Sequence, residues 1–534
     1  MNTLQNTNIS VPNDAVSSQI LGVLRTAGIW STSGAAMAAF FAGTLAALSI
    51  VKFLWRIDPR PTMDVPLASP PDAALYDFGR LLSKGYCENP QGPYKIVGPK
   101  SDLVLLPASY ANDLAAQPSN KLSFGAAIHD FWVSRHTTWR YYLDDDTGRQ
   151  TLMGSLKRDG AHIMPVLDEE ISLAMDNWEQ RGFQAINKTL ETRKQLHNGW
   201  ASVEINPSFR PLVNQAFGRV LVDAPLCRDP GWLDHANGLG LKMMLAARDL
   251  RMIPDCLRPL AKHFLPTYRS LMTARRELAS RIDPLVQRRL ACRNMHDDRH
   301  HDMIEYQLNH SAGWRGVDIN FQTGQIFDNV FAGDNQIVNA LMQCIYDLAT
   351  YPEYQKSLRE EIRTVLSNGA TLSLQNIGML RKVDSFMKEV LRLSPGTLVV
   401  MARKALVEVK LPDGLTIPRG VTVAMPSYAL NQDPNIYGPD ATEFKPFWFL
   451  DVPDVPSSSL AFESVSGPGL DFGRGKASCP GRYIALWTMK VILARFIQRY
   501  EVRLQDGAQR PVNIEAGVHK IANLGGNITI RLAP

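Results

Sequence analysis

A cysteine in a glycine-rich loop is the residue of this chain best suited to distinctive chemistry. Among the 534 residues, 471–485 read D-F-G-R-G-K-A-S-C-P-G-R-Y-I-A, and apolar residues then follow at roughly helical spacing. The pattern predicts a tight turn that presents Cys479 at the start of a helix, with Pro480 at the first helical position. Amide donors at a helix N-terminus favour a thiolate, the form in which cysteine acts as a nucleophile or a metal ligand.

Two other interpretations of this loop stay open from the residues alone. A lone cysteine beside a glycine turn can be buried and purely structural. The glycines also permit a phosphate-binding turn, although the loop lacks the G-x-x-x-x-G-K-[ST] spacing and an obvious preceding strand. The chain's six cysteines form no C-x-x-C pair and are too few for a disulfide scaffold, so they fit a reducing compartment.

Two segments resemble a known family. Residues 472–481, F-G-R-G-K-A-S-C-P-G, resemble the haem-binding loop of the cytochrome P450 family, in which the cysteine is the proximal iron ligand. Residues 388–392, K-E-V-L-R, resemble the family's ExxR helix, where positions i and i+3 share one helical face. Segments 225–232 and 346–362 look like the fungal secondary-metabolism branch, whose members typically oxidise terpenoids, indole alkaloids and related apolar natural products.

The resemblance implies roles for the residues of the loop. Cys479 is the implied axial ligand of the iron in haem b (iron protoporphyrin IX), since a thiolate ligand favours O–O cleavage. Phe472 would shield the sulfur, and Gly475 would let the loop approach the porphyrin. The family often places a cation two residues before the cysteine, where this chain has an alanine. We therefore expect Arg403 or Arg474 to bind the haem carboxylates instead.

The resemblance also implies a structural ion pair between Glu389 and Arg392. Residues 420–449 resemble the strand and meander that follow this helix in relatives. Relatives often complete the pair with an arginine in this meander, at the position of Trp448 in this chain. An indole can stack on a guanidinium but carries no charge. We therefore expect a dyad that holds the haem side of the core less rigidly and lowers haem occupancy.

A predicted long helix departs from the resemblance at the residues that handle protons. The family commonly carries A/G-G-x-D/E-T-T there, whereas residues 332–337 read A-G-D-N-Q-I. Gln336 takes the threonine place and Asn335 the acid place, while Asp334 lies one position early, about 100° round the helix. The two amides do not titrate, but they can order a water chain. Asp334 is either a further catalytic candidate or a polar residue that faces away from the haem.

Two chemistries therefore stay open. In one, a water network held by Asn335, Gln336 or the substrate delivers protons, and the protein is a monooxygenase. In the other, oxygen activation is impaired, and the haem protein catalyses a rearrangement or dehydration. A non-catalytic haem-binding relative is the alternative from a different class.

The elements that must position these residues are mainly helical. Helical patterns cover 163–178, 321–350 and 383–390. Short strands are expected at 406–411, 421–425 and 528–532, the first two joined by a turn at 412–414. The expected fold class is mainly α with small β-sheets, which the resemblance makes a cytochrome P450 fold preceded by one transmembrane helix.

The N-terminal part of the chain predicts a membrane anchor. No charged residue interrupts 35–51, which is near the lower limit for a spanning helix, and a proline-rich stretch follows. Because more basic residues follow this run than precede it, the positive-inside rule puts the later part in the cytosol. A signal peptide is the alternative. The expected organisation in the endoplasmic reticulum membrane is a lumenal tail, a single-pass anchor, a linker and a cytosolic catalytic domain, at 1–34, 35–55, 56–72 and 73–534.

Composition and motifs limit the classes of partner that this protein is expected to bind. Lys plus Arg total 57 and Asp plus Glu total 52, and the net charge of +5 argues against a dedicated nucleic-acid binder. The sequence contains neither a G-x-G-x-x-G dinucleotide fingerprint nor a fused flavin segment. The resemblance therefore implies that electrons come from NADPH through the flavins of a separate NADPH–cytochrome P450 reductase, and that the substrate is a hydrophobic small molecule.

Overall fold

The computed structural model divides the chain into two compact units, Met1–Pro59 and Arg60–Pro534. It describes residues 61–68, 78–97, 102–138, 146–190, 200–292, 300–367 and 371–534, without the side chains of 181–190. The predicted tail and anchor at 1–34 and 35–55 lie outside the described residues. Within the described ranges, no helix combines the length and apolar character that a bilayer crossing demands.

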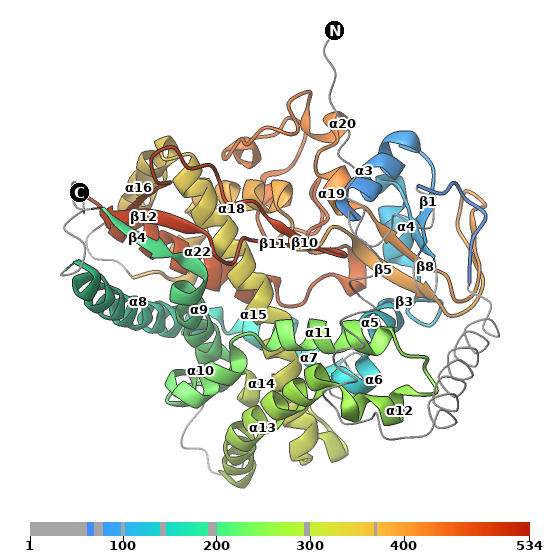
Figure 1. Ribbon diagram of the computed structural model, residues 1–534, viewed down its shortest axis with the longest axis horizontal. Helices are drawn as coiled ribbons and strands as arrows, with labels where there is room; N and C mark the ends of the chain where they lie inside the picture. The colour runs from blue at the N-terminus through green and yellow to red at the C-terminus, as the bar shows by residue number, and fades with distance from the viewer. Residues whose placement is uncertain are drawn as a thin grey trace, which may run out of the picture. The chain divides into compact units, whose positions relative to one another are not determined.

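Helices make up most of the second unit (Figure 1). The α-helices are α3 Phe78–Glu88, α4 Ala111–Ala116, α5 Phe124–Trp132, α6 Ser134–Thr137, α7 Thr147–Gln150, α8 Gly160–Leu190, α9 Ile205–Val222, α10 Pro230–Ala236, α11 Leu239–Arg251, α12 Arg258–Ala261, α13 Pro266–Cys292, α14 Met303–His310, α15 Ile319–Thr350, α16 Glu353–Val365, α17 Leu374–Ile377, α18 Arg381–Leu393, α19 Ser427–Leu430, α20 Pro434–Tyr437, α21 Ser457–Leu460 and α22 Arg482–Arg499. A π-helical segment, η4 Thr151–Leu156, precedes α8.

The strands are short and form small sheets. They are β1 Tyr94–Ile96, β2 Leu103–Leu105, β3 Leu122–Ser123, β4 Ala201–Glu204, β5 Val400–Ala405, β6 Val409–Lys410, β7 Thr416–Ile417, β8 Thr422–Met425, β9 Tyr500–Arg503, β10 Ile514–Ala516, β11 His519–Ile521 and β12 Asn527–Leu532. The largest sheet has the order β1-β2-β8-β5-β3, and the others are β4-β12-β9, β10-β11 and β6-β7. A mainly helical fold with small sheets is thus confirmed.

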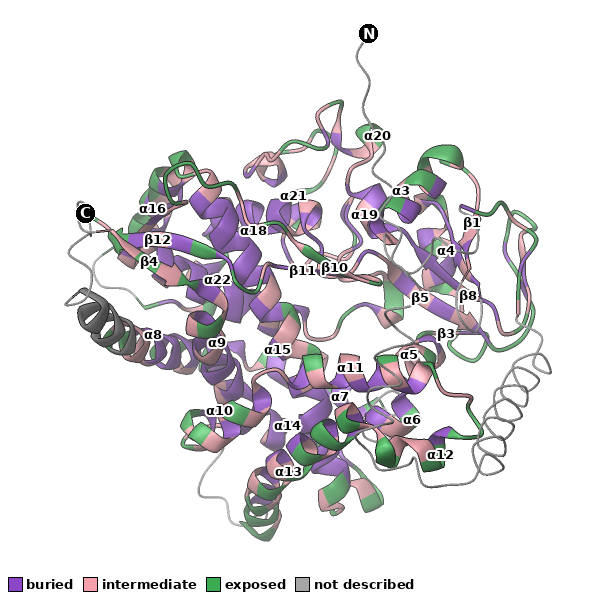
Figure 2. Cartoon of the chain, viewed as in Figure 1, coloured by how far each residue is buried: buried purple, intermediate pink, exposed green. Residues whose placement is uncertain are grey.

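The predicted long helix is confirmed as α15, which runs through the middle of the second unit and contacts α9, α11, α13, α18 and α22 (Figure 1). Most of its residues are buried, as its purple colour in Figure 2 shows. Apolar residues can follow one another along almost its whole length because other helices cover it on several sides. The patterns at 163–178 and 383–390 are confirmed within α8 and α18.

The predicted strand at 406–411 is largely wrong. The strand β5 ends at Ala405, and the next two residues, Leu406 and Val407, are exposed. Only Val409–Lys410 pair, and the turn at 412–414 joins them to β7 rather than to the strand at 422–425. Alternation of residue types therefore did not distinguish a strand of the five-stranded sheet from a short two-stranded hairpin.

The cysteine loop lies where two cores meet. One core surrounds α15, and the other lies against the five-stranded sheet. Leu470 belongs to the core of the sheet, whereas Phe472 and Ile484 pack on the helical core. The loop is therefore anchored from both sides, and its conformation is fixed by packing as well as by its glycines.

Candidate active site

Glycines with left-handed backbone shape the cysteine loop. Gly473 and Gly475 have φ of 68° and 69°, which side-chain-bearing residues rarely adopt. At Gly475 a Cβ would also lie 2.9 Å from the Cβ and the carbonyl oxygen of Ala115 in α4. The amide of Cys479 donates to the carbonyl of Phe472 at 2.8 Å and closes the loop. Glycine at 475 is thus required by the protein's own packing, whatever further role it has.

The sulfur of Cys479 is held among hydrogen-bond donors. Burial raises the pKa of its thiol, while hydrogen bonds from the amides of Gly481 and Arg482 and the charges of Arg482 and Arg149 act in the opposite direction. These amides come directly before and at the start of α22, so the structure supplies the N-terminal donors that the sequence predicts. Pro480, however, precedes the cap residue Gly481 and is not the first helical residue, because the chain first turns these amides towards the sulfur.

The side chain of Cys479 is accessible although protein surrounds it closely. The residue is exposed, although its neighbour Ser478 is buried and the surrounding protein desolvates the thiol. This arrangement fits an axial ligand for a large flat cofactor better than it fits a structural cysteine, which packs without accessible surface.

Two arginines that were not singled out from the sequence fasten the loop. Arg149 of α7 donates to the carbonyl of Ser478 at 3.2 Å, and Arg482 donates to the carbonyl of Cys479 at 2.7 Å. Arg482 follows the cysteine by three residues, so the helix pattern could have indicated it. Arg149 lies far away in sequence, and no local pattern points to it.

Arg403 is a buried cation without a carboxylate partner among the described residues. It lies on β5 and is 4% exposed; its Nη1 donates to the carbonyl of Ala402 at 2.9 Å, and its guanidinium lies over the ring of Phe124. Burial lowers its pKa to about 10. Because an uncompensated buried charge is costly, such a residue is suited to bind an anionic group such as a haem carboxylate.

Arg474 is already occupied elsewhere. Its guanidinium donates to Oδ1 of Asn112 at 3.2 Å and to the carbonyl of Gly467 at 2.8 Å. Both of these partners are neutral, and Nε of Arg474 is buried without a hydrogen-bond partner among the described residues. The two arginines therefore differ in how far their donors are used: Arg474 makes two hydrogen bonds, whereas Arg403, which is 4% exposed, makes one, to the backbone.

The pair Glu389–Arg392 is saturated. The Nε and Nη2 of Arg392 donate to the two carboxylate oxygens of Glu389 at 2.7 and 2.8 Å. Its other three donors go to the carbonyls of Asn431, Ala441 and Glu443 in the meander. All five guanidinium donors are thus used, and both side chains are buried.

Trp448 supports this pair indirectly. The ring that stacks on the guanidinium of Arg392 is that of Tyr437, at 4.8 Å, and Trp448 packs on Tyr437 with the ring centroids 5.0 Å apart. Stacking of Trp448 itself on the guanidinium is not what the structure shows. Because meander carbonyls satisfy Arg392, the expectation that the pair is weakly held loses its physical basis.

The three catalytic candidates on α15 fall into two groups. Ala332 and Gln336, one turn apart, are exposed although most of this helix is buried. Asp334 is buried, and Nη1 of Arg210 in α9 lies 3.4 Å from its carboxylate oxygens and 3.2 Å from Oδ1 of Asn335. The structure thus brings Asp334 and Asn335 together on Arg210 and leaves Gln336 on the accessible face.

The carboxyl group of Asp334 has a shifted pKa. Burial raises its pKa to about 6, against the opposing effects of Arg210 and of a hydrogen bond with Asn214. A group with this pKa can exchange protons near neutral pH. Its partners Arg210 and Asn214 both belong to α9, so its position supports the interpretation of a residue that faces away from the accessible side of α15.

A histidine that sequence reasoning missed lies near this face. The ring of His519 on β11 is 5.7 Å from the rings of Phe131 and Trp132, and Trp132 packs edge-on against Phe331 at 5.0 Å. Burial lowers the pKa of His519 to about 4, so the ring is neutral at physiological pH. The four rings form one aromatic cluster, the aromatic wall, which Phe331 joins to α15.

Together, the fold and the site define a haem-thiolate protein, since an accessible cysteine among amide donors and an unmatched buried cation fit an iron porphyrin with carboxylate side chains. A family model described as Cytochrome P450 matches residues 152–525, well over half of the chain. The chain therefore belongs to the cytochrome P450 family, and it is an oxidoreductase of the monooxygenase type whose family cofactor is haem.

Relatives match most of the chain. Cytochrome P450 monooxygenase braC of Annulohypoxylon truncatum is 28% identical over 509 residues, covering 90% of this chain and 95% of that protein. Cytochrome P450 monooxygenase AN1598 of Emericella nidulans is 28% identical over 444 residues, covering 82% of this chain and 79% of that protein. The crystal structure of the cytochrome P450 CYP102L1 matches with a TM-score of 0.65 at 17% identity, covering 89% of this chain and 100% of that one, which shows the shared fold.

Proposed function

We propose that this enzyme hydroxylates or further oxidises a hydrophobic natural product, such as a terpenoid or indole alkaloid, with electrons from NADPH delivered by a separate cytochrome P450 reductase. The observation that carries the proposal is the accessible Cys479 among the amide donors at the start of α22. When bound, haem supplies the redox chemistry that places one atom of dioxygen in the substrate and releases the other as water.

The protein's own residues set the environment for this chemistry. The amides of Gly481 and Arg482 moderate the basicity of the sulfur, and Arg403 offers a charge for a carboxylate of the cofactor. The aromatic wall of Phe131, Trp132 and Phe331 would offer an apolar surface to a substrate. Gln336 is suited to order water on the accessible face, because its amide both donates and accepts hydrogen bonds.

Product analysis with labelled dioxygen tests the proposal. Full-length protein in membranes with reductase and NADPH is supplied with oxygen-18 gas and candidate terpenoids or indole alkaloids. We expect a product that gains one labelled oxygen atom and depends on NADPH. Product that forms equally well without dioxygen would contradict the monooxygenase proposal for that substrate.

A rearrangement or dehydration is the second candidate function. It is favoured by the position of Asp334 and Asn335 on Arg210, which leaves a non-titrating amide on the accessible face. Conversion of a substrate without dioxygen or NADPH, together with NADPH consumption that yields mainly peroxide, is the result this candidate predicts.

We further propose that the enzyme is held at the endoplasmic reticulum membrane by the segment 35–55, with the tail at 1–34 in the lumen and the linker at 56–72 leading to a cytosolic domain. A second apolar feature supports contact with lipid. Met252, Leu260 and Phe264, on the connection from α11 through α12, are 72%, 70% and 73% exposed. Exposed apolar side chains of this size are typical of interaction surfaces.

Carbonate extraction of the full-length chain tests the anchor. We expect the protein to stay in the membrane pellet, because a spanning segment is not released by high pH. Recovery of the full-length chain in the soluble fraction would contradict the anchor.

A further inference from the structure

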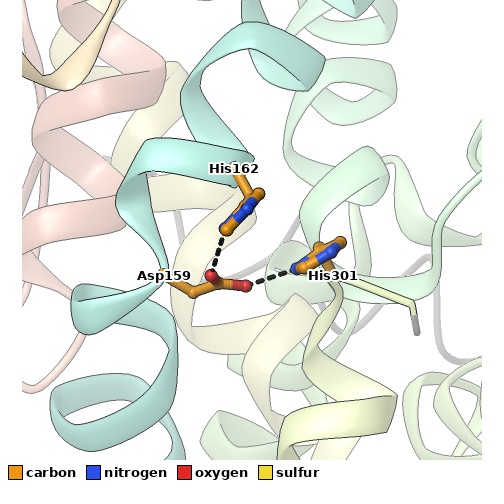
Figure 3. A group of neighbouring side chains, drawn as sticks. All are labelled: Asp159, His162 and His301. Atoms are coloured by element: carbon orange, nitrogen blue, oxygen red, sulfur yellow. Dashed lines mark hydrogen bonds and ion pairs between the residues drawn. The ribbon is translucent and has the colours of Figure 1, made fainter.

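Two histidines and an aspartate converge on the surface at the start of α8. Asp159 lies between η4 and α8, and its two carboxylate oxygens pair with Nδ1 of His162 at 2.6 Å and with Nδ1 of His301 at 2.5 Å (Figure 3). The two imidazole rings are stacked, with centroids 4.5 Å apart and planes 16° apart. One ligand atom from each residue lies within 4.8 Å of the others. The carboxylate thus sits between two imidazoles that come from distant parts of the chain.

The carboxylate of this cluster is also held from a third side. Tyr306 of α14 donates a hydrogen bond to Oδ2, the same oxygen that pairs with His301. The carboxylate is thus fixed in a position that both imidazoles reach.

The cluster is open to solvent. The side chain of His162 is 65% exposed, that of His301 37% and that of Asp159 23%. An ion can therefore reach it, and His162 has room to move. Zinc lies about 2.0–2.2 Å from imidazole nitrogen and carboxylate oxygen, so tetrahedral ligands stand roughly 3.3 Å apart. Small outward movements of the two rings from their hydrogen-bonded positions would admit an ion.

The geometry points to a divalent transition-metal site, and we propose that Asp159, His162 and His301 bind Zn²⁺, with water completing the coordination. Two imidazoles and one carboxylate suit zinc and its first-row neighbours rather than magnesium or calcium, which prefer oxygen ligands. The site uses none of the residues of the cysteine loop and is separate from the iron site.

The bound ion would join two segments. Asp159 directly precedes α8 and His162 lies in its first turn, whereas His301 lies two residues before α14, which contacts η4 and α15. A hydrogen bond of 2.8 Å between Ser155 and His310 already connects η4 with α14. An ion that binds the folded but not the unfolded chain stabilises the fold by mass action.

Equilibrium dialysis of the haem-loaded, full-length enzyme against Zn²⁺ tests the proposal, with protein that carries no histidine tag. We expect about one specifically bound Zn²⁺ per chain and a rise in melting temperature with zinc concentration. His301→Gln and Asp159→Asn should each weaken binding by at least about tenfold. His300→Gln is the matched control, since His300 is the neighbouring residue and faces Asp223 instead.

The haem spectrum of each variant serves as the check on folding, because these residues lie outside the cysteine loop. A variant that keeps its spectrum and loses zinc supports the site. Zinc binding that is equally strong in wild type, His301→Gln and Asp159→Asn, or no specific binding by the wild type at zinc concentrations of about 100 μM, would overturn it; such concentrations well exceed the free zinc that a three-ligand protein site requires.

Discussion

Buried polar groups find their hydrogen-bond partners in different ways on the cysteine side of the site and in the middle of α15. On the cysteine side, the guanidinium of Arg392 is satisfied by one carboxylate and three backbone carbonyls. On α15, the carboxylate of Asp334 depends on side chains from α9, chiefly Arg210, and its pKa stays raised. Hydrogen bonds to backbone carbonyls remain when neighbouring side chains are replaced. A buried group that depends on a few side chains loses its partner when one of them is substituted.

The largest effect is expected when the saturated pair is broken. Arg392→Ala leaves Glu389 buried without its partner and frees three meander carbonyls, at a cost of about 3–5 kcal/mol. We expect severe loss of haem content and of folded protein, measured as haem per chain and as thermal unfolding. Arg381→Ala on the exposed face of the same helix is the control. Wild-type haem content in Arg392→Ala would contradict this account of the pair.

A pH-dependent effect is expected on the other side of the comparison. Burial raises the pKa of Asp334 to about 6, so the folded state holds this proton more tightly than the unfolded state does. The carboxyl therefore reduces stability above about pH 6 and ceases to do so near pH 4. Asp334→Asn should raise stability at pH 7.5 by at most about 3 kcal/mol, with the gain vanishing towards pH 4.

Melting curves at several pH values measure this difference, with Asp506→Asn as the control at an exposed carboxyl. A gain that does not change with pH, or a loss of stability at pH 7.5, would show that the cost of burying Asp334 has been misjudged.

Haem dissociation from variants of Arg403 and Arg474 tests which of these two arginines binds the haem carboxylates. Arg403→Ala removes the unmatched buried charge, so haem should dissociate several-fold faster, as measured by transfer to apomyoglobin. Arg474→Ala should change that rate little, because its donors go to Asn112 and Gly467. Equal dissociation rates for wild type and Arg403→Ala would remove Arg403 from the cofactor site.

The amides of α15 should differ from each other. Gln336→Leu removes the polar group from the accessible face, so less of the NADPH consumed should yield product and more should yield peroxide, by about tenfold or more if this amide orders the proton-delivering water. Asn335→Ala should change this partition less, since Asn335 faces Arg210. The opposite order would place the relay on Asn335.

The smallest effect is expected from Trp448→Arg. An added arginine can only donate hydrogen bonds, and both carboxylate oxygens of Glu389 already accept from Arg392, with Oε1 accepting from the amide of Lys445 as well. Haem content and melting temperature should stay at wild-type values. A clear gain in either would restore the view that the pair lacks a third member.

The sequence predicted what depends on local pattern and missed what depends on distant packing. The long helix, the glycine loop and the ExxR pair carry periodicity or short spacing that can be recognised in one segment. Arg149, Arg210 and His519 reach the site from elements far away in the chain, and their types alone give no signal. The strand predicted at 406–411 was largely wrong because short two-stranded hairpins and strands of a larger sheet share the same alternation.

The central claim is that the sulfur of Cys479 binds the haem iron, and the spectrum of the reduced, carbon monoxide-bound protein tests it most directly. Wild type and the control Cys256→Ser, at an exposed cysteine, should both show the long-wavelength Soret band of thiolate ligation. Cys479→Ser should lose that band, either with the haem or by its displacement to shorter wavelength. An unchanged band in Cys479→Ser would contradict the claim.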